Sequence, residues 1–139
     1  MLIEIFEAAQ SDLGDVANLY AEAGYGAAID PADTVIMAKV HGELVGAVRL
    51  CTEEGVTVLR GMQIRSAFQR QGIGARLLAA CQPILERRQA FCLPYAHLVK
   101  FYAAAGFELA ADAELPDFLK RRRDAYNAKG QNVVAMLRR

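Results

Sequence analysis

Hydrophobic residues alternate with polar residues in several short segments of the chain, and this period-two pattern is typical of β-strands. The turn sequences His41-Gly42-Glu43 and Glu53-Glu54-Gly55 separate three of these segments, so we expect two hairpins in succession. The expected strands are Leu2–Glu7, Thr34–Val40, Leu44–Cys51, Val56–Arg65, Ala90–Leu93, Phe107–Ala110 and Asn132–Leu137.

Other segments carry apolar residues every three to four positions, which predicts amphipathic helices. The expected helices follow a cap at Ser11 or Asp12, follow Gly74, span Tyr95–Ala105 with Gly106 as C-cap, and run from Pro116 and Asp117 to Gly130. Pro83 interrupts the second helical pattern, so a break is expected over Ala79–Gln82. The stretch Gly24–Asp33 is expected to be a loop or a short irregular helix.

Composition changes this picture little. The chain has 139 residues, of which 54% are hydrophobic, which suits one domain over residues 1–139. Its formal net charge is zero, so no broad nucleic-acid surface is expected. No apolar run approaches the length of a membrane span, and the N-terminus does not resemble a signal peptide. We therefore expect a soluble cytoplasmic protein without membrane contact.

The three cysteines and two histidines lack the spacing of a metal site, and no metal is expected. Candidate chemistry lies instead in the segment Gln69–Leu78, QRQGIGARLL, where an expected strand leads into an expected helix. Backbone N–H groups and the helix dipole favour phosphate at such a junction, and Gly72 and Gly74 would let a ligand approach. The segment lacks the Lys-Ser/Thr of a P-loop and the third glycine of a dinucleotide fingerprint. By itself, a purely structural turn remains the alternative.

Two motifs decide between these readings. Gln69–Gly74 resembles the Q/R-x-x-G-x-G/A signature of the GCN5-related N-acetyltransferase (GNAT) superfamily, and Lys100–Phe107, KFYAAAGF, resembles its second signature. The resemblance implies an α/β (α+β) fold: a mixed, mostly antiparallel twisted sheet of about six or seven strands, splayed at its centre and flanked by about four or five helices.

The resemblance also implies acetyl-CoA as the acyl donor, entering where the sheet splays. Backbone groups of the last strand residues before the loop would hold the pantetheine arm, and these residues are Met62, Gln63 and Ile64. The pyrophosphate would lie on the loop that comprises Gln69, Arg70, Gln71, Gly72, Ile73, Gly74 and Ala75. Arg70 would add a charge-assisted contact, unless it is a solvated surface arginine.

Tyr102 corresponds to the family tyrosine that protonates the departing thiolate; the alternative is that Phe101 and Tyr102 are only a packing pair. An attacking amine must first lose a proton, and His97 is the preferred candidate for accepting it, with a helix cap or surface group as the alternative. Glu53 and Glu54 are weaker candidates because glutamates on hairpins are usually solvated.

The short Gly24–Asp33 segment favours a small-molecule amine as acceptor over a protein surface. A non-catalytic acyl-CoA-binding or sensing module and a protein or peptide N-acetyltransferase remain alternatives. The run Lys120–Arg123 is read as a solvated helix face, or as arginines that close over an acidic acceptor or the coenzyme phosphate. Homodimerisation through an edge strand is common in the family, and the residues do not specify it.

Overall fold

Four antiparallel strands form one half of the sheet in the computed structural model, which describes residues 1–26 and 28–139. They are β1 (Ile3–Glu7), β2 (Thr34–Val40), β3 (Glu43–Glu53) and β4 (Val56–Ile64), each paired with the next. Both predicted hairpins are present, because His41-Gly42 and Glu54-Gly55 adopt positive φ at both turn residues. Such turns match the right-handed twist of the strands that they join.

Three short strands complete a seven-stranded sheet in the order β1-β2-β3-β4-β5-β7-β6. They are β5 (Ala90–Cys92), β6 (Glu108–Leu109) and β7 (Met136–Arg138). β5 runs parallel to β4, and β7 lies antiparallel between β5 and β6. The predicted strand Asn132–Leu137 is too long at its start, where Val133 makes only an isolated bridge to Tyr95.

The helices are α1 (Leu13–Glu22), α2 (Ile73–Ala80), α3 (Gln82–Leu85), α4 (Val99–Ala103) and α5 (Asp117–Ala128). Short 3-10 turns span Gln10–Asp12, Ser66–Phe68, Ala96–Leu98 and Asp112–Glu114. The break predicted near Pro83 separates α2 from α3 at Cys81. The helix predicted over Tyr95–Ala105 is shorter, because its first turn is a 3-10 turn. In the predicted loop Gly24–Asp33, Ala27 lies outside the described residues.

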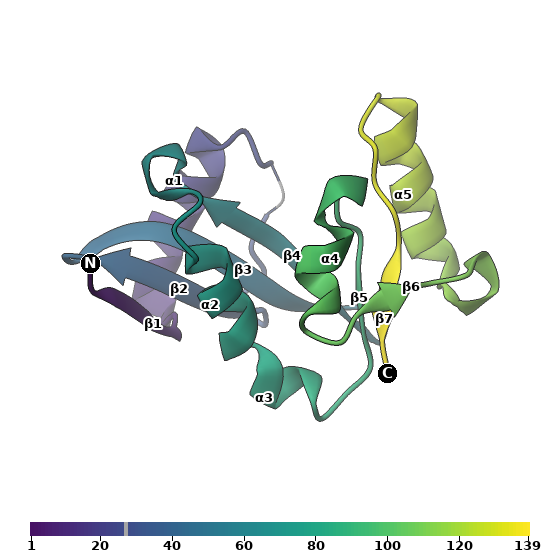
Figure 1. Cartoon of the computed structure of the whole chain (residues 1–139), viewed down its shortest axis with the longest axis horizontal. Helices are drawn as coiled ribbons and strands as arrows, with labels where there is room; N and C mark the ends of the chain where they lie inside the picture. Colours follow the sequence, from purple (N-terminus) through teal and green to yellow (C-terminus); the bar gives the residue numbers. More distant parts are fainter. Residues whose placement is uncertain (27) are drawn as a thin grey trace.

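Side chains divide the sheet into two faces. Leu50 and Leu59 belong to the apolar cluster that α2 and α4 cover, whereas Met37 packs in the cluster that α1 covers and Val58 in the cluster that α5 covers. Helices therefore lie on both sides of the sheet, with α2 and α3 in front of it in Figure 1. The predicted fold class, a mixed sheet flanked by helices, is confirmed.

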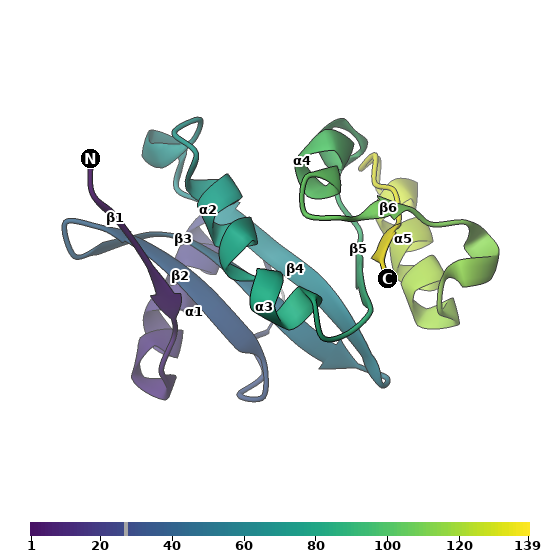
Figure 2. The same ribbon diagram turned by 60° about the horizontal axis from the view of Figure 1, so that its bottom comes forward.

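The sheet opens between β4 and β5. The two strands pair only at Thr57–Ala90 and Val58–Phe91, at the start of β4, and then separate toward its end (Figures 1 and 2). Within the described residues, the stretch of β4 after Val58 has a strand partner only on its β3 side. Its other edge therefore presents main-chain groups that an extended ligand can pair with.

Candidate active site

A tight loop joins the end of β4 to α2. Arg65–Phe68 form a short turn, and the Gln69 side-chain amide donates a hydrogen bond back to the Ile64 carbonyl over 3.0 Å. Arg70 and Gly72 then adopt left-handed φ values of 64° and 81°. This backbone reverses the chain so that α2 begins at Ile73 with its N-terminus open.

The N-terminus of α2 presents backbone donors without partners. Within the described residues, no hydrogen bond is donated by the backbone N–H groups of residues 70–75, and the first one closing the helix runs from Arg76 N–H to Gly72 O over 3.2 Å. Free N–H groups at a helix start combine with the helix dipole into an anion-binding site. The loop is thus suited to a phosphate or pyrophosphate.

The loop contains two glycines, Gly72 and Gly74, and each has a different structural role. A Cβ on Gly72 would meet no atom within 4 Å, so the space beside it is open, while its φ of +81° disfavours other residues. A Cβ on Gly74 would lie 3.4 Å from Cζ of Phe101 on α4. Gly72 therefore leaves room for a ligand, and Gly74 lets α2 approach α4 closely.

A β-bulge re-aims the end of β4 just before this loop. Arg49 pairs with Arg60 and Ala47 with Gln63, so Gly61 and Met62 together oppose the single residue Val48. Gly61 has a φ of +71°, and a Cβ there would lie 2.6 Å from the Tyr20 hydroxyl oxygen. Bulges of this kind turn a strand and redirect its main-chain groups. Met62 is the second bulge residue, and Gln63 and Ile64 follow it to the end of β4.

Tyr102 lies on α4 within the same apolar cluster that Met62, Ile64 and Phe101 border. Its ring packs edge-on against Phe101 and Phe107, with centroid distances of 4.9 and 6.3 Å. Burial raises the pKa of the Tyr102 phenol well above its ordinary value of 10.0. A phenol in this environment keeps its proton at neutral pH, as a proton donor must.

The structure brings Met62–Ile64, the loop 69–75 and Tyr102 to one end of the opening between β4 and β5, but it leaves His97 apart. His97 is exposed on the 3-10 turn before α4, where its ring stacks on Tyr95 at 5.8 Å. Arg70 is also exposed, and no ion pair among the described residues involves its side chain. Arg70 is therefore free to meet an anion on the loop.

The sequence prediction missed Arg49 and Arg60, which lie on the opposite face of the sheet. Arg49 is 2% exposed; it donates to Asp33 over 2.9 Å and to the Tyr25 hydroxyl over 3.2 Å. Its cross-strand neighbour Arg60 donates to Glu53 over 3.0 Å, and Arg122 of α5 donates to the same carboxylate. A charged residue inside the apolar run of β3 was the one available signal, since the other contacts join distant parts of the chain.

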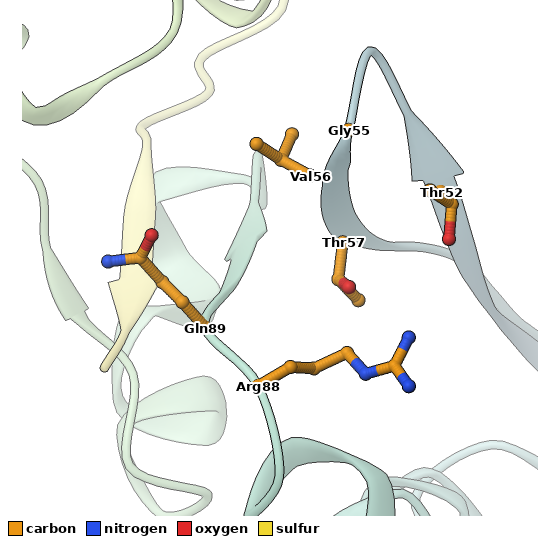
Figure 3. Close-up of a pocket in the computed structure, with 6 residues that line it drawn as sticks. All are labelled: Thr52, Gly55, Val56, Thr57, Arg88 and Gln89. Carbon is orange, nitrogen blue, oxygen red and sulfur yellow. The ribbon is translucent and has the colours of Figure 1, made fainter.

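Two hollows lie elsewhere. One, of about 340 Å³, is lined by Thr52, Gly55, Val56, Thr57, Arg88 and Gln89. Figure 3 shows Arg88 extending past Thr57 toward Thr52, while Gln89 points away from them. A second, of about 250 Å³, shares Thr52, Thr57 and Arg88. Both adjoin the start of β4, roughly 20 Å by strand rise from Met62–Ile64. Neither hollow includes a predicted site residue.

Comparison with known protein families identifies the family of this chain. Residues 13–116 match the family described as "Acetyltransferase (GNAT) domain". The chain belongs to the GNAT family. The resemblance predicted from the two motifs is thereby confirmed, and the chain is an acyltransferase of the GNAT type. No curated protein matches the sequence.

Solved structures share the GNAT fold at low identity. Escherichia coli ElaA is 18% identical with a TM-score of 0.71, over 99% of this chain and 100% of that one. N-acetylglutamate synthase from Neisseria gonorrhoeae, solved with coenzyme A and N-acetyl-glutamate, is 23% identical with a TM-score of 0.66, over 100% of this chain. The chain spans only 35% of that synthase. The ribosomal-protein-S18-alanine N-acetyltransferase of E. coli is 16% identical with a TM-score of 0.70, over 99% of this chain and 93% of that one.

Two further features bear on the site's surroundings. Within residues 1–26 and 28–139, no group of three or more His, Cys, Asp or Glu side chains is placed to hold a metal ion. No helix in the described part of the chain is long and apolar enough to cross a membrane.

Proposed function

We propose that this GNAT protein, as one domain over residues 1–139, transfers an acetyl group from acetyl-CoA to the primary amine of a small molecule by direct attack. The observation that carries the proposal is the convergence of three parts: the donor-rich start of α2, the free edge of β4 and the Tyr102 hydroxyl. Each of these suits a different part of the thioester donor. A cytoplasmic location stays a prediction from the sequence, whereas homodimerisation, common in the family, is not specified by the residues.

The coenzyme's pyrophosphate fits the loop 69–75. The free N–H groups of Gln71 to Ala75 supply hydrogen bonds without a charged side chain, and the open space beside Gly72 admits phosphate oxygens. Arg70, exposed on the same loop, adds a charge-assisted contact.

The pantetheine arm is an extended chain with two amides, so it pairs well with a free strand edge. Met62–Ile64 provide that edge, because β5 leaves β4 after Val58. A main-chain N–H in this stretch would also stabilise negative charge that develops on the thioester oxygen.

The departing thiolate takes a proton from Tyr102 in this proposal. The phenol suits the role because its raised pKa keeps the proton on the oxygen until the leaving group develops charge. The ring packs edge-on against Phe101 and Phe107, which restricts its movement.

The attacking amine must be neutral, so its proton passes to a base or to water. Glu53 is a poor base here: although burial raises the pKa of its carboxyl, the hydrogen bond from Arg122 and the charge of Arg60 outweigh burial and lower it below 4.5. His97 remains our proposal for the acceptor of this proton, reached through water because its exposed ring contacts Tyr95.

Release of free coenzyme A thiol from acetyl-CoA tests the proposal. The assay uses a panel of amino acids, polyamines, aminated metabolites and short peptides with free N-termini. We expect release with one class of small amine. Release with peptides alone would replace the proposal with peptide N-acetylation, and acetyl-CoA binding without release for any amine would favour a sensing module.

A further inference from the structure

An arginine cluster lies on the face of the sheet between α1 and α5. It consists of Arg60 on β4, Glu53 at the end of β3, and Arg122 and Tyr126 on α5. The Glu53 carboxylate accepts from Arg60 on one oxygen and from Arg122 on the other, and Arg60 also reaches the Tyr126 hydroxyl over 3.5 Å. The side chains of Glu53, Arg60 and Arg122 are 21%, 21% and 24% exposed, so a solute can reach them.

Charge in this cluster is incompletely neutralised. Arg49, the cross-strand neighbour of Arg60, forms its own ion pair with Asp33, whereas Arg60 and Arg122 both pair with the single carboxylate of Glu53. Two guanidinium groups against one carboxylate leave one net positive charge. In addition, Arg122 Nη1 has neither solvent contact nor a hydrogen-bond partner among the described residues. Partly buried cations normally have a counter-charge, so the cluster has room in its charge balance for one more negative group.

Hydroxyl groups near the cluster add donors rather than acceptors. The Tyr126 hydroxyl oxygen accepts a hydrogen bond from Arg60, and the Tyr25 hydroxyl oxygen accepts one from Arg49. Each hydroxyl oxygen thus accepts from an arginine, which leaves its own O–H free to donate. A set of guanidinium and hydroxyl donors with a single net charge matches a carboxylate better than a dianionic phosphate.

The position of Arg60 connects this cluster to the transfer chemistry. Arg60 directly precedes the bulge residue Gly61, and Met62 follows at the free edge of β4. Two residues of strand separate the Cα atoms of Arg60 and Met62 by about 7 Å. The guanidinium of Arg60 extends toward Glu53, which pairs with Val56, so it lies farther from Met62 than the Cα atom does. An acceptor that binds both sites must therefore carry its carboxylate several bonds away from its amine.

We propose that the acceptor of this enzyme is an amino acid, whose carboxylate binds Arg60 and Arg122 while its amine faces the thioester. The inference deepens the proposed function and rests on it. It assigns Arg60 and Arg122 as specificity-determining residues. Within the run Lys120–Arg123, Arg122 pairs with Glu53 of the sheet, whereas Lys120 pairs with Asp117 and Arg123 pairs with Asp112 and Asp124.

The test uses matched acceptors that differ only in the acidic group. Each amino acid that supports thiol release is compared with its carboxamide and its decarboxylated amine, and phosphoethanolamine is included as an anionic amine without a carboxylate. The proposal predicts a KM at least about 10-fold lower for the amino acid than for either neutral analogue, as expected for a charge-assisted contact. Equal KM values, or preference for phosphoethanolamine, would overturn it.

Variants then link the preference to the cluster. Arg122→Gln leaves Glu53 paired with Arg60, so no buried carboxylate is stranded and the fold is expected to persist. The variant should raise KM for the amino acid about 10- to 100-fold and leave KM for the neutral analogues and the affinity for acetyl-CoA unchanged. Arg122→Lys should restore part of the preference, and Arg121→Gln, on the exposed side of α5, should change nothing.

The outcomes separate the two proposals. An Arg122→Gln enzyme with unchanged KM for amino acids would overturn the inference and leave the transferase intact. Absence of thiol release with every amine, while acetyl-CoA still binds, would contradict the proposed function itself, and the inference would fall with it.

Discussion

Gly74 faces Phe101, so the two sequence motifs meet in space. A Cβ on Gly74 would lie 3.4 Å from Cζ and 3.7 Å from Cε1 of Phe101, and Phe101 directly precedes Tyr102. Through this contact the start of α2, which suits phosphate, lies directly against the helix that carries the proposed proton donor. In the proposed complex, the position of the thioester relative to Tyr102 would depend on this approach of α2 to α4.

We therefore expect side-chain size at residue 74 to affect both stability and catalysis. Gly74→Ala should be tolerated, because its Cβ would make an ordinary contact with Phe101. Gly74→Leu should displace Phe101, lower the free energy of unfolding by about 1–3 kcal/mol and reduce kcat. Chemical denaturation and steady-state kinetics measure both effects. Similar kcat values for the two variants would contradict the coupling.

Removal of the Tyr102 hydroxyl tests its role as acid. Tyr102→Phe should lower kcat by about 100-fold, the lower end of general acid catalysis, while calorimetry finds unchanged acetyl-CoA affinity. Stability should hardly change, because no hydrogen bond among the described residues uses this hydroxyl.

The pH profile provides an independent readout of the same residue. Because burial raises the Tyr102 pKa above 10.0, the acid form persists as the pH rises. Tyr102 should therefore cause no fall in kcat between pH 7 and about pH 10. A descending limb within that range that disappears in Tyr102→Phe would contradict the assignment.

Glu53 should make stability depend on pH. Its pKa is lowered, so the carboxylate stabilises the fold above the ordinary value of 4.5, and that contribution is lost as the pH falls through the folded value. At pH 7, Glu53→Gln should lower the free energy of unfolding by about 1–2 kcal/mol, since the ion pairs are partly exposed.

Denaturation at several pH values separates this effect from a packing defect. The difference between Glu53→Gln and the unchanged protein should shrink below pH 4.5. Glu54→Gln, on the exposed turn residue next to it, should stay within about 0.5 kcal/mol at every pH. A difference for Glu53→Gln that persists in acid would rule out the ion pairs as its cause.

Local patterns predicted the elements well, because local chemistry determines them. His41-Gly42 and Glu54-Gly55 adopt the positive φ values that two-residue hairpins require. The helical segment is interrupted at Cys81, shortly before Pro83. The last strand was predicted too long, because Val133 and its neighbours have the right pattern but bond to Pro94, Tyr95 and Asn127 instead of to a continuous strand.

The donor side of the site was predicted from the motifs, but the contacts that bring Glu53, Arg60 and Arg122 together were not. Glu53, Arg60 and Arg122 come from three elements, and no local period shows that they meet. Gly61 within a strand was a signal for a bulge that went unused. Charge pairing between distant elements depends on the strand order, and the insertion of β7 between β5 and β6 has no local signature.

The measurement that tests the central claim most directly is calorimetric titration with acetyl-CoA of the unchanged protein, Gly72→Glu and Gly55→Glu. Both glycines have a φ of +81° and open space around them, so the two variants carry the same backbone strain of about 1 kcal/mol. Only residue 72 lies at the proposed pyrophosphate site. The account predicts binding by the unchanged protein and by Gly55→Glu, and at least a 100-fold loss, about 2.7 kcal/mol, in Gly72→Glu. Equal binding by all three proteins, or no binding by any, would contradict it.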